Sequence, residues 1–200
     1  MDEKKIILIF DICSSTTIIE DLIRNESFDQ WRQVIKGLNV MLIDNKQAYD
    51  YVIYKFIGDG WILLFNPDIN GNQLFKFMEL LIHTYNSLNR SKLKKYLTVK
   101  IPIDGISFGA DIGTLKKIRL EKNDEYIGRS LNIASRLQGS ISQKDSNPAN
   151  KILMSKKLYM SIRNDIMGNK KYLIKDVTRT LKNISGGDNY LCKKIIIKAT

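Results

Sequence analysis

Residues 51–65 read YVIYKFIGDGWILLF, and residues 6–16 read IILIFDICSST. The apolar and β-branched residues on both sides of Gly58-Asp59-Gly60 predict two strands, 51–57 and 61–65, joined by a tight Asp-Gly turn. The second stretch predicts a buried strand over 5–10 that runs into Asp11. A carboxylate at the end of an apolar strand must be solvated, paired or bound to metal, because burying it alone is costly. Two such aspartates beside small or hydroxyl residues predict a shared divalent-metal site for phosphate chemistry.

The other predicted elements follow this strand-turn pattern along the chain. Helical spacing covers residues 18–45, 73–88, 129–138 and 155–165, and strand patterns cover 97–108, 109–115, 151–154, 172–179 and 188–197. The order predicts an α+β fold with a ferredoxin-like βαββαβ core, whose antiparallel sheet has helices on one face, and a C-terminal βαββ extension. Glycines at 105, 109 and 113 predict close backbone approach or bulging in a strand pair. We expect residues 1–200 to form a single domain.

Composition limits the function classes. No apolar run approaches the roughly 20 residues that span a bilayer, and the charged N-terminus does not fit a signal peptide. Two cysteines do not make a disulfide framework, so we expect a cytoplasmic protein without a membrane partner. The net charge of +11 favours an anionic partner, although the scattered lysines fit general lysine abundance equally well.

His83 is the only histidine in the chain. This scarcity argues against a histidine-ligated zinc site and against a Ser-His-Asp triad. Any metal would then be bound by oxygen ligands, which suits Mg²⁺ or Mn²⁺.

Four motifs occur in an order that resembles the class III nucleotidyl cyclases. They are Phe10-Asp11-Ile12 with Ser15-Thr16, Lys55-Phe56-Ile57-Gly58-Asp59-Gly60, Gly105-Ile106 with Gly109 and Gly113, and the segment GRSLNIASRL at 128–137. Together they cover about residues 5–140, and the tail around Lys182 matches more loosely. Each motif alone is weak, but four in the family's order are specific.

The resemblance implies attack of a ribose 3′-OH on the α-phosphate of a nucleoside triphosphate, with release of pyrophosphate. It implies two divalent metal ions, Mn²⁺ or Mg²⁺, held by Asp11, Asp59 and the backbone carbonyl of Ile12. Asn132 would orient the ribose and Arg136 would stabilise charge on the phosphate; the two residues share one helix face.

The substrate's phosphates and base would contact further residues. Backbone N–H groups of Cys13, Ser14, Ser15 and Thr16 would hold the β- and γ-phosphates, with Lys182 as another substrate-binding residue. An ordinary N-cap explains the same segment, and Cys13-Ser14-Ser15 stands where the family usually has a glycine. Lys55 and Glu125 would form an ion pair that reads the base, and either Tyr54 or Phe56 would stack on it; core packing is the alternative for both aromatic rings.

In the family, one active site is built from two catalytic domains. This chain carries both sets of residues, so the resemblance implies a homodimer with sites at its interface. The small size, the altered base pair and the helix at 131–138 look like the pyrimidine cyclases of bacterial antiphage signalling, whose cyclic UMP or cyclic CMP acts on a separate effector protein. Adenylate cyclase is the close alternative. A palm-type polymerase that binds nucleic acid and a non-catalytic dimerisation domain are more distant ones, and we expect no nucleic-acid partner.

Overall fold

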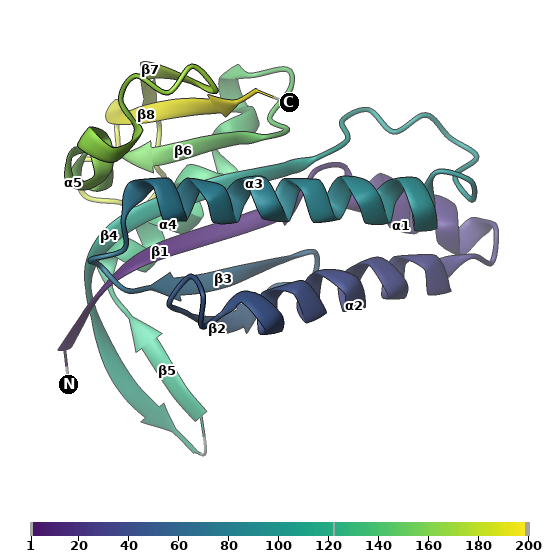
Figure 1. The fold of residues 1–200 in the computed structure, drawn as a ribbon, viewed down its shortest axis with the longest axis horizontal. Coiled ribbons are helices and arrows are strands. Elements are labelled where there is room, and N and C mark those ends of the chain that lie inside the picture. Colours follow the sequence, from purple (N-terminus) through teal and green to yellow (C-terminus); the bar gives the residue numbers. More distant parts are fainter. Residues whose placement is uncertain (1, 122, 199–200) are drawn as a thin grey trace.

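The computed structural model describes residues 2–121 and 123–198, in which eight strands form one sheet (Figure 1). The strand order is β2-β3-β1-β4-β6-β8-β7, and β5 pairs with β4 outside this path. The strands are β1 (Asp2–Ile12), β2 (Tyr51–Phe56), β3 (Gly60–Phe65), β4 (Ile106–Leu120), β5 (Asn123–Ile127), β6 (Lys151–Ser155), β7 (Tyr172–Arg179) and β8 (Tyr190–Ile197). The α-helices are α1 (Ser15–Arg24), α2 (Phe28–Asn45), α3 (Gly71–Leu88), α4 (Arg129–Gly139) and α5 (Lys156–Ile166). A π-helical turn (Asn89–Leu93) follows α3, and a short 3₁₀ helix (Ile141–Lys144) follows α4.

The predicted α+β fold and its βαββαβ core are confirmed. β1 pairs antiparallel with β3 and with β4, and β2 pairs antiparallel with β3. The βαββ extension joins this core through a parallel pairing of β4 with β6, so the whole sheet is mixed. None of the helices in the described ranges is long and apolar enough to cross a membrane.

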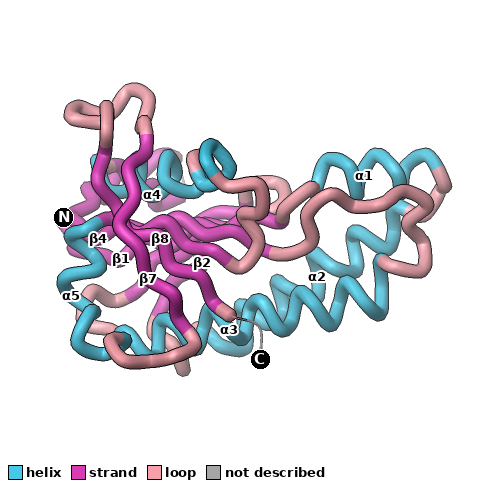
Figure 2. The backbone as a smooth tube through the Cα atoms, turned by 90° about the horizontal axis from the view of Figure 1, so that it is seen from above, coloured by secondary structure: helices cyan, strands magenta, loops and turns pink. Residues whose placement is uncertain are grey.

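Helices cover both faces of the sheet, not one. Successive side chains of a strand point to opposite faces, so the unbroken apolar run in β1 needs cover on both sides. Ile6 and Leu8 pack in the core formed with α1, α2, α3 and α5, whereas Ile7 and Ile9 pack with Ala134 of α4. Figure 2 shows the strands between α4 on one side and α2 and α3 on the other.

Two stretches differ from the predicted elements. The helical pattern over 18–45 is divided into α1 and α2, because the chain turns at Glu26, whose φ is +57°. The strands predicted over 97–108 and 109–115 are one strand that begins only at Ile106, and β5 was not predicted. Gly109 does not break β4. Glycine is needed at position 109 because a Cβ there would lie 2.3 Å from the carbonyl oxygen of Ala134 in α4. The predicted close approach is therefore to a helix rather than to a strand.

The second half of β4 leaves the body of the sheet. Its pairing with β1 ends at Lys116, and residues 117–120 pair with β5 alone. An ion pair of 2.8 Å between Lys117 and Asp124 links the two strands. The resulting β4–β5 hairpin projects away from the other elements (Figure 1) and carries Glu125.

Candidate active site

Asp11 and Asp59 lie at neighbouring strand ends. In the β1–β3 register Asp11 faces Gly60, and the N–H of Ile12 donates to the carbonyl of Asp59 at 3.2 Å. A Cβ at Gly60 would lie only 1.9 Å from the carbonyl oxygen of Phe10, so no other residue fits without a shift of the backbone. Glycine at 60 therefore allows the approach of β3 to β1 that brings the two carboxylates together.

The electrostatics of this pair fit a bound cation. Burial, then the hydrogen bond and charge of Asp59, raise the pKa of Asp11 to about 8, while a hydrogen bond from Gln138 opposes the rise. The hydroxyl of Ser15 donates to the carboxylate of Asp59. Two crowded carboxylates form an oxygen-only donor set that suits Mn²⁺ or Mg²⁺. The described ranges contain no cluster of three or more His, Cys, Asp or Glu suited to a metal, so backbone oxygen, water or substrate would have to complete the coordination.

The segment that follows β1 presents the N-terminus of α1. Ser14 is the N-cap by position, but its φ is +57° and its hydroxyl accepts from the N–H of Ile103 at 3.2 Å, so it does not cap the first turn. Cys13 is buried, its N–H donates to the carbonyl of Gly105, and burial raises the pKa of its thiol to about 11. Thr16 is exposed. The side-chain cap is thus missing from a helix N-terminus whose N–H groups suit phosphate oxygens.

Helix α4 presents Asn132 and Arg136 to solvent. Ile133, Ala134 and Leu137 are buried against the sheet, and the other two side chains share the exposed face. Arg136 and Lys182 line one cavity of about 220 Å³. Asp11, Cys13, Ser14, Ser107 and Gln138 line another of about 310 Å³, and Gly139 lies on the wall of both. Within one chain, the cavity lined by Asp11 and the cavity lined by Arg136 therefore lie on two sides of the C-terminus of α4.

The structure contains the Lys55–Glu125 ion pair. Lys55 Nζ lies 3.4 Å from Oε2 of Glu125, and Tyr54 Oη donates to the same oxygen at 2.5 Å. The hydrogen bond from Tyr54 is the largest cause that lowers the pKa of Glu125. The rings of Tyr54 and Tyr126 pack in a T-shaped arrangement, with centroids 5.3 Å apart. Phe56 is 49% exposed beside Trp61, with ring centroids 4.8 Å apart.

Three contacts at this site were not predicted from the sequence. The amide of Gln138 donates to the hydroxyl of Ser107 at 3.2 Å and also reaches Asp11. The hydroxyl of Tyr54 holds Glu125. The sequence places Gln138 on the same helix as Arg136, which marks it as a candidate site residue. Its partners become clear only from the β1–β4 register, which places Ser107 opposite Asp11.

The fold is shared with solved nucleotide cyclase structures. The adenylyl cyclase CyaB from P. aeruginosa is 19% identical, with a TM-score of 0.68 over 100% of this chain and 97% of that one. The guanylyl cyclase Cya2 is 15% identical, with a TM-score of 0.66 over 98% and 92%. The guanylate cyclase domain of RhGC from Catenaria anguillulae, in complex with GTP, is 16% identical, with a TM-score of 0.66 over 100% and 98%. Neither a family model nor a curated protein sequence matches the chain.

Proposed function

We propose that this protein is a nucleotidyl cyclase that converts a nucleoside triphosphate to the 3′,5′-cyclic monophosphate and pyrophosphate. The observation that carries the proposal is the pairing of Asp11 with Asp59 at two strand ends, on a fold shared with adenylyl and guanylyl cyclases. A carboxylate pair at this position has little structural value, because burial and mutual repulsion disfavour its ionised form.

The roles of the chain's own residues follow from their positions. Two divalent ions bound by Asp11 and Asp59, with the carbonyl of Ile12, would lower the pKa of the 3′-OH and neutralise the triphosphate. The N–H groups at the start of α1 would bind the β- and γ-phosphates, beside Ser15 and the exposed Thr16. The guanidinium of Arg136 can donate two parallel hydrogen bonds, the geometry needed by oxygens of the α-phosphate as charge develops there.

Asn132 and Lys182 would bind substrate together with Arg136. Asn132 lies one helical turn before Arg136 on the exposed face, where its amide would hold the ribose. Lys182 lies in the same cavity as Arg136 and would contact the phosphate chain.

We propose that each site is shared by two copies of the chain. Support comes from the separation of the two cavities and from the solvent-facing Asn132 and Arg136. In a C₂ dimer, Asp11 and Asp59 of one copy would meet Asn132 and Arg136 of the other, twice.

The shared site is tested by mixing inactive chains. Asp59→Ala and Arg136→Ala chains are each expected to lose activity. After an equimolar mixture is re-equilibrated, half of the dimers are mixed and each has one intact site, so about a quarter of wild-type activity should return. The control is the double variant, with both substitutions in one chain, mixed with either single variant: none of its dimers has an intact site. No recovery in the first mixture would exclude the shared site.

We propose a pyrimidine nucleoside triphosphate as the substrate, with cyclic CMP or cyclic UMP as the product. A lysine donor beside a carboxylate acceptor complements a ring nitrogen beside an exocyclic amine, as in cytosine or adenine, and also an exocyclic carbonyl beside a ring N–H, as in uracil. Tyr54 fixes Glu125, and the extra methylene of glutamate relative to aspartate leaves less room for a purine. Adenylate cyclase is the alternative, since the same donor and acceptor complement adenine. We further propose that the cyclic nucleotide is a second messenger of antiviral defence that acts on a separate effector. Support for this role comes from the small size of the chain, the Lys55–Glu125 pair and the resemblance of residues 131–138.

The decisive measurement is incubation with Mn²⁺ and each of the four nucleoside triphosphates, followed by separation of the products. A cyclic pyrimidine monophosphate is the expected result, and cyclic AMP would select the alternative. Pyrophosphate without any cyclic monophosphate would remove the cyclase proposal. Dinucleotides or longer products would favour a palm-type polymerase.

A further inference from the structure

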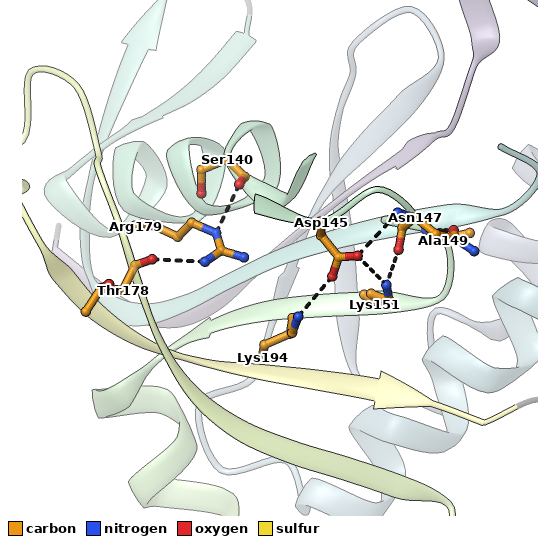
Figure 3. A network of polar contacts seen from close by, with 8 residues as sticks. All are labelled: Ser140, Asp145, Asn147, Ala149, Lys151, Thr178, Arg179 and Lys194. Carbon is orange, nitrogen blue, oxygen red and sulfur yellow. Dashed lines mark hydrogen bonds and ion pairs between the residues drawn. The ribbon is translucent and has the colours of Figure 1, made fainter. Parts of the chain in front are cut away.

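Arg179, the last residue of β7, is a buried cation. It is 3% exposed, its Nε donates to the carbonyl of Ser140 at 3.2 Å, and its Nη1 donates to the carbonyl of Thr178 at 2.9 Å (Figure 3). Within residues 2–121 and 123–198 no carboxylate lies within ion-pair distance of its guanidinium. The neighbouring Lys151 and Lys194, by contrast, share Asp145.

The charge of Arg179 is held by the end of a helix. Ser140 is the C-cap of α4, and its carbonyl lies at the negative end of the helix dipole, which stabilises a cation. The N–H of Ser140 donates in turn to the carbonyl of Arg136 at 3.0 Å. One residue thus connects the buried guanidinium to the backbone of the arginine that we assign to the α-phosphate.

The chain after Arg179 packs on the same helix. Leu181 is buried against Ile133 and Leu137 of α4, and its N–H donates to the carbonyl of Gly187 at 2.9 Å. This packing places the next residue, Lys182. At the other end of α4, Arg129 Nη2 donates to the carbonyl of Ser185 at 2.6 Å. Helix α4 and the loop after β7 therefore form one packed unit, tied at both ends by an arginine.

This unit forms the cavity that holds Arg136 and Lys182. Ser140, which accepts the hydrogen bond from Arg179, and Thr180, the next residue in the chain, both line this cavity. An apolar side chain of similar volume would fill the space under α4 without the desolvation cost of a charge, so packing alone does not explain an arginine there.

We propose that Arg179 is a positioning residue for phosphate binding: its guanidinium fixes the C-terminus of α4 relative to the loop after β7, so that Arg136 and Lys182 face one cavity. Its charge also raises the positive potential at the base of that cavity, where a polyanion would bind. This inference rests on the proposed cyclase function and assigns no contact between Arg179 and substrate.

The first test separates catalysis from stability. Arg179→Met should lower kcat by roughly 10- to 100-fold with a melting temperature within a few degrees of wild type. Arg179→Lys should recover part of the loss, because an ammonium still donates to Ser140 but lacks the planar fork. Lys194→Met is the matched control, because it also removes a largely buried cation, from β8. This variant should be less stable than wild type, while its kcat stays within about twofold of the wild-type value. Equal kcat values for Arg179→Met and Lys194→Met would overturn the proposal.

The second test asks which half of the site Arg179 serves. Mixed with Asp59→Ala chains, Arg179→Met chains should regain activity, because the mixed dimer has one site with an intact Arg179 beside Arg136. Mixed with Arg136→Ala chains, they should not. The same result in both mixtures would mean a general structural role and would reject the proposal.

The proposal stays testable if Arg179→Met does not fold or if the shared site is wrong. If Arg179→Met does not fold, Arg179→Lys takes its place in both mixtures. If the mixture of Asp59→Ala with Arg136→Ala regains nothing, the shared site is wrong. The kcat of Arg179→Met at an unchanged melting temperature then decides the positioning role by itself.

Discussion

Lys55 Nζ lies 3.4 Å from Oε2 of Glu125, a contact between β2 and the projecting β4–β5 hairpin. Lys55 is half exposed, so the ion pair adds little to stability. Its position matters more, because Tyr54 binds the same carboxylate and the N–H of Tyr126 donates to the Tyr54 hydroxyl at 3.0 Å. A donor and an acceptor therefore lie side by side, with the acceptor held by the Tyr54 hydroxyl.

Loss of the Tyr54 hydroxyl should relax base selection. Tyr54→Phe keeps the ring that packs on Tyr126 but removes the donor to Glu125, so the carboxylate gains freedom to move. We expect the ratio of kcat/KM between the preferred nucleotide and its nearest competitor to fall by roughly tenfold. Tyr126→Phe is the control, since only the backbone of Tyr126 contacts Tyr54 by hydrogen bonds. An unchanged ratio in Tyr54→Phe would contradict the assigned role.

Removal of the Asp59 charge should preserve or raise the melting temperature while it lowers activity. Asp59→Asn keeps an acceptor for the Ser15 hydroxyl but removes the charge that disfavours ionised Asp11. The metal-free variant should melt at the same temperature as wild type or a few degrees higher, while cyclase activity falls by at least about 100-fold. Calorimetry and product analysis on the same preparation check both parts. A clear fall in melting temperature would indicate a structural role for Asp59.

Metal affinity should rise with pH. The pKa of Asp11 is raised to about 8, so the metal-free protein holds a proton there below that pH, and a cation must displace it. We expect Mn²⁺ affinity to increase by up to about tenfold per pH unit between pH 6 and 8 and to level off above. Titration calorimetry in two buffers of different ionisation enthalpy measures the released proton. An affinity independent of pH across this window would exclude a protonated Asp11.

Asp145 should stabilise the C-terminal part of the sheet. Burial raises its pKa, but hydrogen bonds from Lys151 and Lys194 outweigh that and lower it to about 2 (Figure 3). A lowered pKa gives stability that is present above the unfolded value of about 3.9 and is lost as pH falls toward 2. Asp145→Asn should therefore cost about 2 kcal/mol at pH 7 in urea unfolding, and less below pH 4.

The control for Asp145 is another aspartate–lysine contact that also involves β8. Asp176 lies 2.8 Å from Lys193, but its side chain is 59% exposed, so solvent screens the pair. Asp176→Asn should change the free energy of unfolding by less than about 1 kcal/mol. Equal losses for the two variants would show that burial of Asp145 adds nothing.

The sequence predicts local features of this molecule better than its long-range pairings. The hairpin around Asp59 and the amphipathic pattern of α4 depend on neighbouring residues, and both were predicted from spacing. β5 was missed because its pairing partner, the end of β4, lies outside the main body of the sheet. The unbroken apolar run of β1, in which Ile7 and Ile9 are as apolar as their neighbours, is a signal that both faces are covered, but it does not say that α4 is the helix on the second face.

The candidate site divides in the same way. Asp11, Asp59 and the Asn132/Arg136 face can be picked out from the sequence, because they stand in motifs that resemble those of class III nucleotidyl cyclases and occur in the same order. The hydrogen bond from Tyr54 to Glu125 and the contact of Arg179 with Ser140 join residues 71 and 39 positions apart. Nothing in the amino-acid order indicates such partners before the strands and helices are placed.

The close approach of α4 to β4 at Gly109 would limit how the proposed cyclase is controlled. The backbone of the helix lies directly on the strand, so α4 has no space to slide or tilt toward the sheet without a clash. Within one copy, Arg136 therefore keeps a fixed distance from the strand next to Asp11. In the homodimer that we propose, an activator would therefore act by turning one copy against the other, which changes the gap between Asp11 and Asp59 of one copy and Arg136 of its partner.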